Sequence, residues 1–499
     1  MTKGQRAFDT TDLGARLRKG QRQVVAGKYA DALTTLGPAV RARPTSASAH
    51  YWLARAYFFL GEIGRATTHL RKSLRSRYTS RTLEFLATIA PFDPAFDHRA
   101  VKKHRTALYA QLAASATGSR VLANRIATRK VLRIGYVSSF FQDENWMKPV
   151  WALIDHHDRR RVQVHLFSDA PRSAVAHLEH VRRPVRFHDI SRYDNPGAAR
   201  LIARKKIDVL VDLNGFSNRR RLPLYVMKPA PVLVAWFNVL GTTGMPTFDA
   251  VIGDEWVAAD GEERWFVEPI VRLPMSHLAF TVDYPVPDVR PAPCLRNECV
   301  TFGCLTSMYK LNPSTIDAWS EILRRAPRSR LVLANATLDD EGNRAHLSRR
   351  FAAVGIDAER VTLFGGETHR AFLGHYDSID LALDTFPYGC GTTAIEALWQ
   401  GVPMLTIVGD RWIARQGVSI LTSAGLDRFI CRDVDSYIDA AVQWATSARA
   451  PAVLNTLRTT MRKRLTASGV CDCSRFAKCM EGVYRDLWTS ARRLESRPT

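Results

Sequence analysis

The sequence has no long hydrophobic run. Its 499 residues contain no stretch near the ~18 consecutive apolar residues that a membrane-spanning helix requires. The first residues, MTKGQRAFDTTDLGARLRKGQR, have no apolar core of the kind that a secretory signal needs. We therefore expect a cytoplasmic protein without a membrane segment. The 46% apolar and 24% charged shares are typical of a soluble globular chain.

Cysteine is present without a pattern that indicates disulfides or a metal site. The eight cysteines are Cys294, Cys299, Cys304, Cys390, Cys431, Cys471, Cys473 and Cys479. We interpret them as reduced cytosolic thiols. The stretch CDCSRFAKC near the end has no matching Cys/His pair at ligand spacing, so we predict no bound metal.

Acidic residues are scarce at the start of the chain. Residues 1–130 hold 24 Lys and Arg but only 7 Asp and Glu, a surplus of 17 within the net charge of +23. Such a basic region attracts an acidic protein, nucleic acid or an anionic surface, or it forms an ordinary solvated helix face. No nucleic-acid-binding module accompanies it, so we do not expect nucleic acid as a partner.

Small residues in this basic region recur with a period. In AGKYADAL and LGEIGRAT, Gly27 and Gly61 lie 34 residues apart, and Ala32 and Ala66 keep the same offset. The period resembles that of tetratricopeptide repeats, whose helix pairs pack through small residues. About two repeats are visible, so they should dock on helices near residues 99–129 or on the domain behind them. The alternative is a plain helical layer without a peptide groove.

After residue 130 the pattern changes to apolar strands that alternate with helices. Four such runs lie between residues 131 and 241, and five more lie between 299 and 409. Continuous apolar strands separated by helices indicate parallel sheets covered on both faces. We predict an α/β fold with two Rossmann-like domains facing a cleft, in which ligands lie beyond the carboxyl ends of the strands.

The chain is too long for a single core and divides into domain-sized units. Residues 282–294 contain four prolines and separate the two series of strands. We predict a helical repeat region over 1–129, an N-terminal Rossmann-like domain over 130–285, a C-terminal Rossmann-like domain over 296–445, and C-terminal helices over 446–499 that pack back on the core.

The second series of strands contains a crowded turn. The strand IDLALD ends at Asp384, and Gly391, Thr392 and Thr393 lead into a helix. The first amides of that helix have no partners within it, and the positive end of the helix dipole lies behind them. Gly391 allows close approach to a phosphate, the two threonine hydroxyls add donors, and Glu396 can accept from ribose hydroxyls. Simple helix capping by Thr392 is the alternative.

A second loop adds a cation. Ser307 and Lys310 follow the first strand of the second series, and Asn312, Pro313 and Ser314 then start a long amphipathic helix. A lysine at that strand end can reach a diphosphate and neutralise the charge that grows on it as a bond breaks. The alternative is that Lys310 is an ordinary surface lysine.

Long stretches of the chain resemble a known family. They are LRIGYVSSFF, LVDLNGFS, KPAPVLVAWFNVLGTTGMPTFDAVIGD, YKLNPSTIDAWSEILRRAP and LALDTFPYGCGTTAIEALWQGVPMLTIVGDRWIARQGVSIL. In this order, and with helical repeats in front, they resemble the O-linked N-acetylglucosamine transferase and SPINDLY family. The resemblance implies a GT-B glycosyltransferase fold, no essential metal and no cofactor. It also implies transfer of a sugar, from a uridine diphosphate donor such as UDP-N-acetylglucosamine, to protein side chains in the cytosol or nucleus.

The resemblance implies roles for the residues in both loops. Ser307 and Lys310 would hold the nucleotide diphosphate. Thr392 and Thr393 would hold its phosphates from the start of the helix, and Glu396 would hold the ribose. Glu396 stands where the family often has Asp, and both carboxylates can accept hydrogen bonds from a ribose.

The sequence departs from the family on the acceptor side. The family's loop after the first strand carries a histidine, but here the loop reads FFQDENWMKPVW and the next histidine is His156. The family's histidine before the threonine pair is Gly391 here, and its His-Leu pair on the uracil side is Phe372 and Leu373. The donor and the acceptor therefore stay open.

The base for sugar transfer has three candidates in the sequence. A hydroxyl that attacks a sugar must pass its proton to a base or to a phosphate oxygen of the donor. Asp143 and Glu144 lie in the loop after the first strand, where they are bases or caps of the next helix, and Asp212 lies in VLVDLNG. We predict that neither loop carboxylate alone is indispensable and that the donor phosphate or Asp212 takes the proton.

Three functions fit the sequence. The first is a glycosyltransferase that moves N-acetylglucosamine from a UDP-sugar to Ser or Thr of cytosolic proteins, which bind to the repeats and their basic surface. The second is a related enzyme with another sugar or another acceptor, such as Asn, flagellin or another surface protein. The third is a non-catalytic adaptor. The presence of Lys310, the threonine pair and Glu396 argues against the adaptor.

Overall fold

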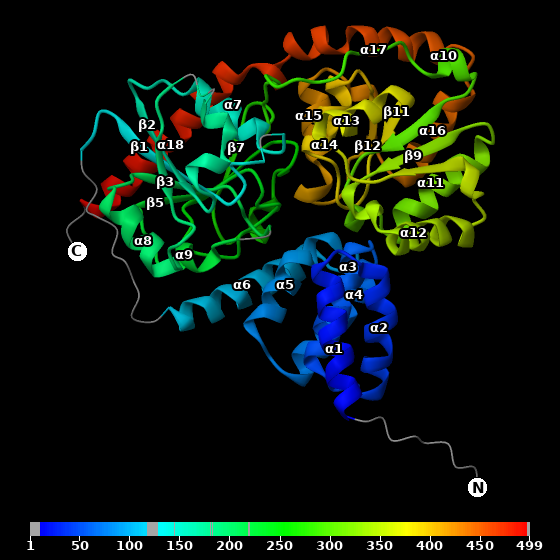
Figure 1. Cartoon of the computed structure of the whole chain (residues 1–499). Coiled ribbons are helices and arrows are strands. Elements are labelled where there is room, and N and C mark those ends of the chain that lie inside the picture. The colour runs from blue at the N-terminus through cyan, green and yellow to red at the C-terminus, as the bar shows by residue number, and fades with distance from the viewer. Residues whose placement is uncertain are drawn as a thin grey trace. The chain divides into compact units, whose positions relative to one another are not determined.

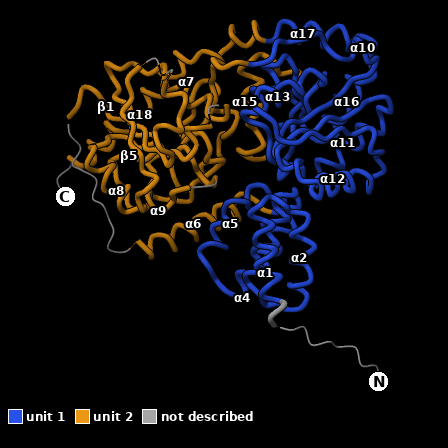
Figure 2. Tube along the Cα trace, in the orientation of Figure 1, with its two compact units in different colours: residues 1–95, 286–409, 429–461 blue, residues 96–285, 410–428, 462–499 orange. Residues whose placement is uncertain are grey.

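The chain forms two compact units (Figure 1). The structure is a computed structural model, and it describes residues 10–116, 128–143, 145–179, 181, 183–217 and 220–496. Unit 1 comprises residues 1–95, 286–409 and 429–461, and unit 2 comprises residues 96–285, 410–428 and 462–499 (Figure 2). Each unit is therefore held together by contacts between stretches that lie far apart in the sequence.

The described part of unit 1 begins with helices that are arranged as two pairs followed by one more helix. They are α1 (Thr10–Val25), α2 (Tyr29–Ala42), α3 (Ala47–Phe59), α4 (Ile63–Ser76) and α5 (Ser80–Ile89). The turn of each pair holds a glycine in the left-handed conformation, Gly27 with φ +78° and Gly61 with φ +81°. Ala32 and Ala66 are completely buried. The 34-residue period thus predicted two equivalent helix pairs correctly.

The rest of unit 1 is a parallel sheet with helices. Its strands are β8 (Thr301–Cys304), β9 (Arg330–Ala334), β10 (Val361–Phe364), β11 (Leu381–Leu383), β12 (Met404–Ile407) and β13 (Ile430–Cys431), in the order β10-β9-β8-β11-β12-β13. Its helices are α10 (Cys294–Asn297), α11 (Pro313–Arg325), α12 (Glu341–Ala353), α13 (His369–Gly374), α14 (Thr392–Trp399), α16 (Val434–Thr446) and the first part of α17 (Ala450–Thr466).

Unit 2 repeats this design. Its strands are β1 (Leu132–Ser138), β2 (Val162–Ser168), β3 (Arg186–Asp189), β4 (Val209–Asp212), β5 (Val232–Ala235), β6 (Ala250–Asp254) and β7 (Ile270–Leu273), in the order β3-β2-β1-β4-β5-β6-β7. Its helices are α6 (His98–Ser115), α7 (Lys148–His156), α8 (Asn195–Arg204), α9 (Leu222–Val226), α15 (Gln416–Ser423), the end of α17, and α18 (Cys473–Glu495).

The predicted strands are present, and the sequence missed four others. Strands β4 and β5 are buried along their whole length, as expected for a parallel sheet covered on both faces. The missed strands are β3, β6, β7 and β13. Strands β3 and β7 are largely exposed or half-buried and carry arginine, and β13 has only two residues. None of these three shows the apolar run by which a buried strand is predicted.

Both sheets have a reversal of strand order at their centre. In unit 2 the chain adds β2 and β3 on one side of β1 and then places β4 on the other side of β1. In unit 1 it adds β9 and β10 on one side of β8 and then places β11 on the other side of β8. In parallel sheets of this type, ligands bind beyond the carboxyl ends of the two strands at such a reversal. The loops after these four strands are therefore the first places to look for a site.

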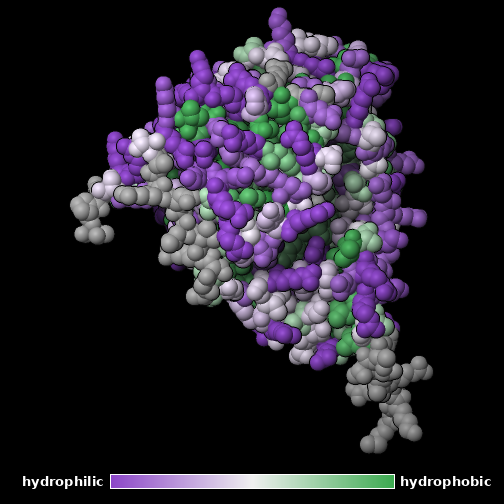
Figure 3. Space-filling view, turned by 60° about the vertical axis from the view of Figure 1, so that its left-hand side comes forward, coloured by the Kyte–Doolittle hydropathy of each residue, from purple (hydrophilic) through white to green (hydrophobic). Residues whose placement is uncertain are grey.

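Figure 3 shows one face of the molecule coloured by hydropathy. The face drawn in Figure 3 is mostly hydrophilic, and its hydrophobic side chains form small separate clusters. None of the described helices combines the length and the apolar composition that crossing a bilayer would demand.

Candidate functional site

The loops after β8 and β11 are joined by a buried lysine. Lys310 is only 8% exposed, and its Nζ donates to the carbonyl of Gly389 over 2.9 Å. The same ammonium group lies over the ring of Tyr388, 3.9 Å from its centroid. Burial excludes the alternative of a surface lysine. Ser307, three residues earlier in the same loop, is exposed.

Two residues at the start of α11 form hydrogen bonds to the loop after β11. Asn312 caps α11, since its side chain accepts from the amide of Thr315. The side-chain amide of Asn312 also donates to the carbonyl of Phe386, and the Thr315 hydroxyl donates to the same carbonyl over 3.0 Å. The helix start that the sequence predicted therefore also fixes the loop after β11.

Asp384 shapes the turn that follows β11. Its Oδ1 accepts from the amides of Thr385 and Cys390, at 2.8 Å and 2.7 Å, and its Oδ2 accepts from the Thr406 hydroxyl at 2.6 Å. Burial raises the pKa of Asp384 well above its usual value. The pKa of Cys390 is lowered, first by a hydrogen bond from the thiol of Cys304 and then by the charge of Lys310, although burial opposes this shift.

Helix α14 begins directly at the glycine-threonine turn. Gly391 is its N-cap and offers no side-chain hydrogen bond to the first amides. Thr392 is the first helical residue, so helix capping does not explain it. Thr392 and Thr393 are half-buried. The positive end of this helix therefore lies beside the lysine loop without a side-chain cap, which is an arrangement suited to an anion.

Glu396 lies one turn into α14 and contacts a histidine that sequence analysis missed. The Oε1 of Glu396 is 3.5 Å from the Nε2 of His369 on α13. The hydroxyl of Tyr376 donates to the carbonyl of Thr393 over 3.4 Å and so supports the start of α14. The structure thus brings Lys310, the two threonines and Glu396 to one end of the sheet in unit 1.

The N-terminal helices of unit 1 pack directly on the lysine loop. Phe58 of α3 stacks on Tyr309, with 5.1 Å between ring centroids. The ring of Phe92 is tilted against that of Tyr388, with 4.6 Å between ring centroids. A Cβ atom added at Gly61 would lie 2.3 Å from the carbonyl oxygen of Leu311. Sequence analysis missed these residues, because no local pattern links an aromatic residue of α3 to one about 250 positions later.

Polar contacts join the same helices to α12. The amide of Ala30 donates to Asn343 Oδ1 at 3.0 Å, and Asn343 Nδ2 donates to the carbonyl of Gly27 at 2.7 Å. Arg350 donates to the carbonyl of Leu60 at 2.8 Å. Within unit 1, the helix pairs therefore dock on the domain that carries the lysine loop.

In unit 2, Asp212 ends β4 and is buried. Its Oδ1 accepts from the amide of Asn214 and the hydroxyl of Tyr225, at 3.0 Å and 2.9 Å, and its Oδ2 accepts from the amide of Gly215 at 3.1 Å. Burial raises the pKa of Asp212 to about 6, and these hydrogen bonds oppose the shift. Asn214 in turn bonds Ser139, so the loops after β1 and β4 are joined.

The loop after β1 carries the other two candidate bases. Asp143 is half-buried, and its carbonyl oxygen accepts from the amides of Trp146 and Met147, at 3.1 Å and 3.0 Å. The N-cap of α7 is Met147, without a side-chain hydrogen bond, so Asp143 is not the N-cap of that helix. Glu144 lies outside the described residues.

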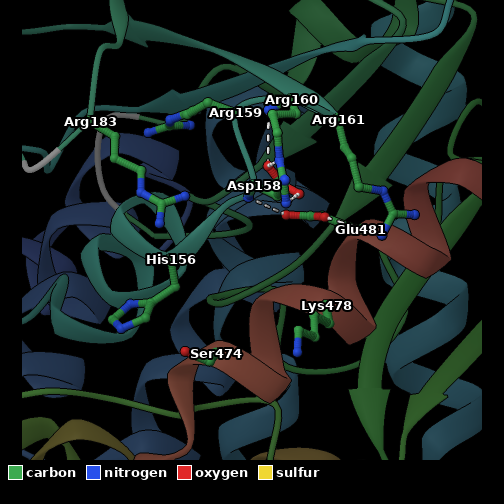
Figure 4. A pocket seen from close by; sticks show the side chains of 9 residues that line it. All are labelled: His156, Asp158, Arg159, Arg160, Arg161, Arg183, Ser474, Lys478 and Glu481. Carbon is green, nitrogen blue, oxygen red and sulfur yellow. Dashed lines mark hydrogen bonds and ion pairs between the residues drawn. The ribbon is translucent and has the colours of Figure 1, made fainter.

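Unit 2 also contains a pocket of about 640 Å³ (Figure 4). Its lining is mostly cationic and consists of His156, Asp158, Arg159, Arg160, Arg161, Arg183, Ser474, Lys478 and Glu481. The residues between α7 and β2 that line it precede β2, so the pocket lies at the amino end of that strand. Asp212 lies at the carboxyl end of β4, so the pocket is at the opposite end of the parallel strands. We do not assign it to the candidate site.

Comparison with known proteins agrees with this geometry. The family model of glycosyl transferase family 41 matches residues 99–280 and 286–480. The chain belongs to glycosyl transferase family 41. This confirms the family that the sequence motifs resembled.

Two curated relatives are 31% and 27% identical to this chain over the residues that match. This chain is 31% identical over 375 residues to the probable UDP-N-acetylglucosamine–peptide N-acetylglucosaminyltransferase SPINDLY of Solanum lycopersicum. The match covers 73% of this chain and 39% of that protein. The chain is 27% identical to the probable transferase SEC of Arabidopsis thaliana, covering 72% and 37%. The chain thus spans about two fifths of the length of these relatives.

A solved structure of the family matches nearly the whole chain. An O-GlcNAc transferase mutant from Thermobaculum terrenum superposes with a TM-score of 0.87 at 29% identity, covering 98% of this chain and 93% of that one. With two parallel sheets and a helical region in front, the chain has the GT-B type of fold that was expected.

The two equivalent glycines allow a matched test of the contact between α3–α4 and the lysine loop. Alanine at either glycine must adopt a left-handed conformation, at a cost of about 1 kcal/mol. Only at Gly61 does the new Cβ also collide with the loop, whereas at Gly27 nothing lies within 4 Å. We expect Gly61→Ala to lower the free energy of unfolding by about 1–3 kcal/mol more than Gly27→Ala does, measured by denaturant titration. Equal losses in the two variants would contradict the role of this contact.

Proposed function

We propose that this chain is a protein glycosyltransferase that moves N-acetylglucosamine from a uridine diphosphate donor to Ser or Thr of proteins in the cytoplasm. The observation that carries the proposal is the pairing of a buried lysine with an uncapped helix start at the strand reversal of unit 1. Membership of family 41 supports the reaction class. The names of the SPINDLY and SEC relatives support the choice of sugar and of protein acceptors.

In this proposal the donor lies across the ends of β8 and β11. Lys310 and Ser307 hold the diphosphate, and the first amides and hydroxyls of α14, at Thr392 and Thr393, hold its phosphates. Gly391 has no side chain to keep a phosphate away from these amides. Glu396 accepts from the ribose hydroxyls. Its neighbour His369, at 3.5 Å, supports the orientation of this carboxylate.

In this proposal, Lys310 supplies most of the electrostatic stabilisation of the leaving diphosphate. Negative charge grows on the diphosphate as the bond to the sugar breaks, and a cation that is already in place stabilises that charge without reorganisation. The aromatic ring of Tyr388 and the surrounding burial exclude water, which strengthens the interaction. Because a lysine and the helix amides supply the positive charge, we propose that the diphosphate needs neither a metal ion nor a cofactor.

The proton of the acceptor hydroxyl passes to a phosphate oxygen of the donor or to Asp212. Asp212 follows β4 at the reversal of the unit 2 sheet, and its pKa of about 6 leaves it ionised at neutral pH. Its three hydrogen bonds support a second role for Asp212, the positioning of the loop at Asn214 and Gly215. Asp143 and Glu144 are not required in this scheme.

The basic N-terminal helices contribute to the choice of acceptor. Residues 1–130, which include these helices, carry a charge surplus of 17 that favours acidic stretches of partner proteins. Since the same helices pack on the lysine loop within unit 1, they also support donor binding.

The proposal is tested by intact-mass analysis of candidate acceptor proteins after incubation with the enzyme and a panel of nucleotide sugars. We expect a gain of one N-acetylhexosamine with UDP-N-acetylglucosamine, mapped to Ser or Thr by fragmentation. A gain with another sugar, or on Asn, would replace the donor or the acceptor. Failure to bind any nucleotide in calorimetry would favour a non-catalytic adaptor.

Removing the lysine tests the centre of the site. Lys310→Ala should lower turnover with saturating donor by about 10²–10³, because a positioned charge on the leaving group is lost. Lys463→Ala, which changes an exposed lysine on α17, is the control and should keep full turnover. Near-normal turnover in Lys310→Ala would show that the assigned role is wrong.

The pH profile of transfer tests the route of the proton. A base must be ionised, so if Asp212 takes the proton, turnover should fall about tenfold per pH unit below its pKa of about 6, and Asp212→Asn should abolish transfer. If the donor phosphate takes it, Asp212→Asn should keep transfer and the wild type should show no such fall. Asp143→Asn and Glu144→Gln should both remain active. Abolished transfer in either loop variant, with nucleotide binding intact, would make that carboxylate the base.

A further inference from the structure

Three potential metal ligands of unit 2 lie together outside the proposed transfer machinery. They are Asp155 on α7, His177 on the short helix η3 (Ala176–Glu179), and Asp283. Asp283 lies two residues before residue 285, where this stretch of unit 2 ends. One ligand atom from each lies within 4.8 Å of the other two. Sequence analysis could not find this group, because its members are 22 and 106 residues apart.

Two of the three side chains are held firmly in place. The Nε2 of His177 is 3.3 Å from Oδ2 of Asp155, and the side chains are only 7% and 8% exposed. The imidazole stacks on Trp151, with 4.3 Å between ring centroids. Trp151 and Asp155 lie one turn apart on the same face of α7, so one helix orients both the ring and the carboxylate that meet His177.

The second oxygen of Asp155 lacks a partner. Asp155 Oδ1 is buried and has no hydrogen-bond partner among the described residues. A buried carboxylate oxygen without a donor is costly and rare in folded proteins. Arg159 lies close enough for its charge to act on Asp155, but these two described side chains form no ion pair within 4 Å, and the Nη2 of Arg159 donates to the carbonyl of Ile154. An ion pair with Arg159 therefore does not account for this oxygen.

The third side chain completes the group from the solvent side. Asp283 is exposed. Its neighbour Tyr284 lies beside the start of α7, with the Nζ of Lys148 5.8 Å from the ring centroid. Asp283 is thus the member of the group that is in contact with solvent.

We propose that Asp155, His177 and Asp283 bind a divalent transition-metal cation of the Zn²⁺ type. One imidazole nitrogen and two carboxylates form a donor set that suits Zn²⁺, with the fourth position left to water. Bonds of about 2.0–2.2 Å in tetrahedral geometry place ligand atoms about 3.4 Å apart. The His177–Asp155 distance of 3.3 Å already matches this spacing. The cation would satisfy Asp155 Oδ1 and fasten the segment at Asp283 to α7.

The test is a comparison of cation binding in variants of the full chain. After treatment with a chelator and dialysis, Zn²⁺ and Co²⁺ are titrated and followed by calorimetry and by visible absorption. We expect Asp155→Asn, His177→Gln and Asp283→Asn each to weaken binding by about tenfold or more. The controls His156→Gln and Asp158→Asn change the same residue types nearby, outside the group, and should bind as the wild type does.

Two features keep the test decisive. Asp283 is exposed, so Asp283→Asn should fold even where loss of a buried partner prevents folding. The chain also has eight thiols, and Co²⁺ bound by thiolate gives an intense near-ultraviolet band that nitrogen and oxygen ligands do not give. The proposal predicts Co²⁺ binding without that band. Absence of binding by the wild type, equal binding in all variants, or a thiolate band would each overturn it.

Discussion

The candidate donor site depends on how a buried ammonium group is satisfied. Lys310 lies in the interior, and its Nζ bonds the carbonyl of Gly389 and faces the ring of Tyr388. A cation out of water needs such partners, so this contact requires the loops after β8 and β11 to lie against each other. The same closure brings the start of α14 next to the lysine. An anion-binding site then follows from the sheet topology, because both loops emerge at the reversal of strand order.

Unit 2 also joins the two loops that lie at its reversal of strand order. There Asn214, after β4, bonds the backbone and side chain of Ser139, after β1, and Asp212 fixes the turn that presents Asn214. Each sheet thus ties together the two loops at its own reversal. The bond in unit 1 uses a cation, whereas the bond in unit 2 uses an amide and a buried carboxylate. The positive charge in unit 1 suits the diphosphate of the donor that we propose.

The N-terminal helices belong to the candidate donor site as much as to any partner surface. Phe58, stacked on Tyr309, and Phe92, tilted against Tyr388, cover the two loops with aromatic rings. Gly61 lets the turn between α3 and α4 approach the carbonyl of Leu311. Through these contacts, a ligand that moves the helices can alter the position of Lys310.

The sequence by itself determined the fold class, most of the strands, the equivalent helix pairs and the family, because these depend on local periodicity and on long motifs. It also indicated Lys310, Thr392, Thr393 and Glu396, since each follows a strand end at a recognisable position. Only the tertiary structure decided that Lys310 is buried, that Gly391 rather than Thr392 is the cap of α14, and that Phe58 and Gly61 support the lysine loop. These features arise from contacts between residues up to about 250 positions apart, and burial and pairing at such distances leave no trace in local composition.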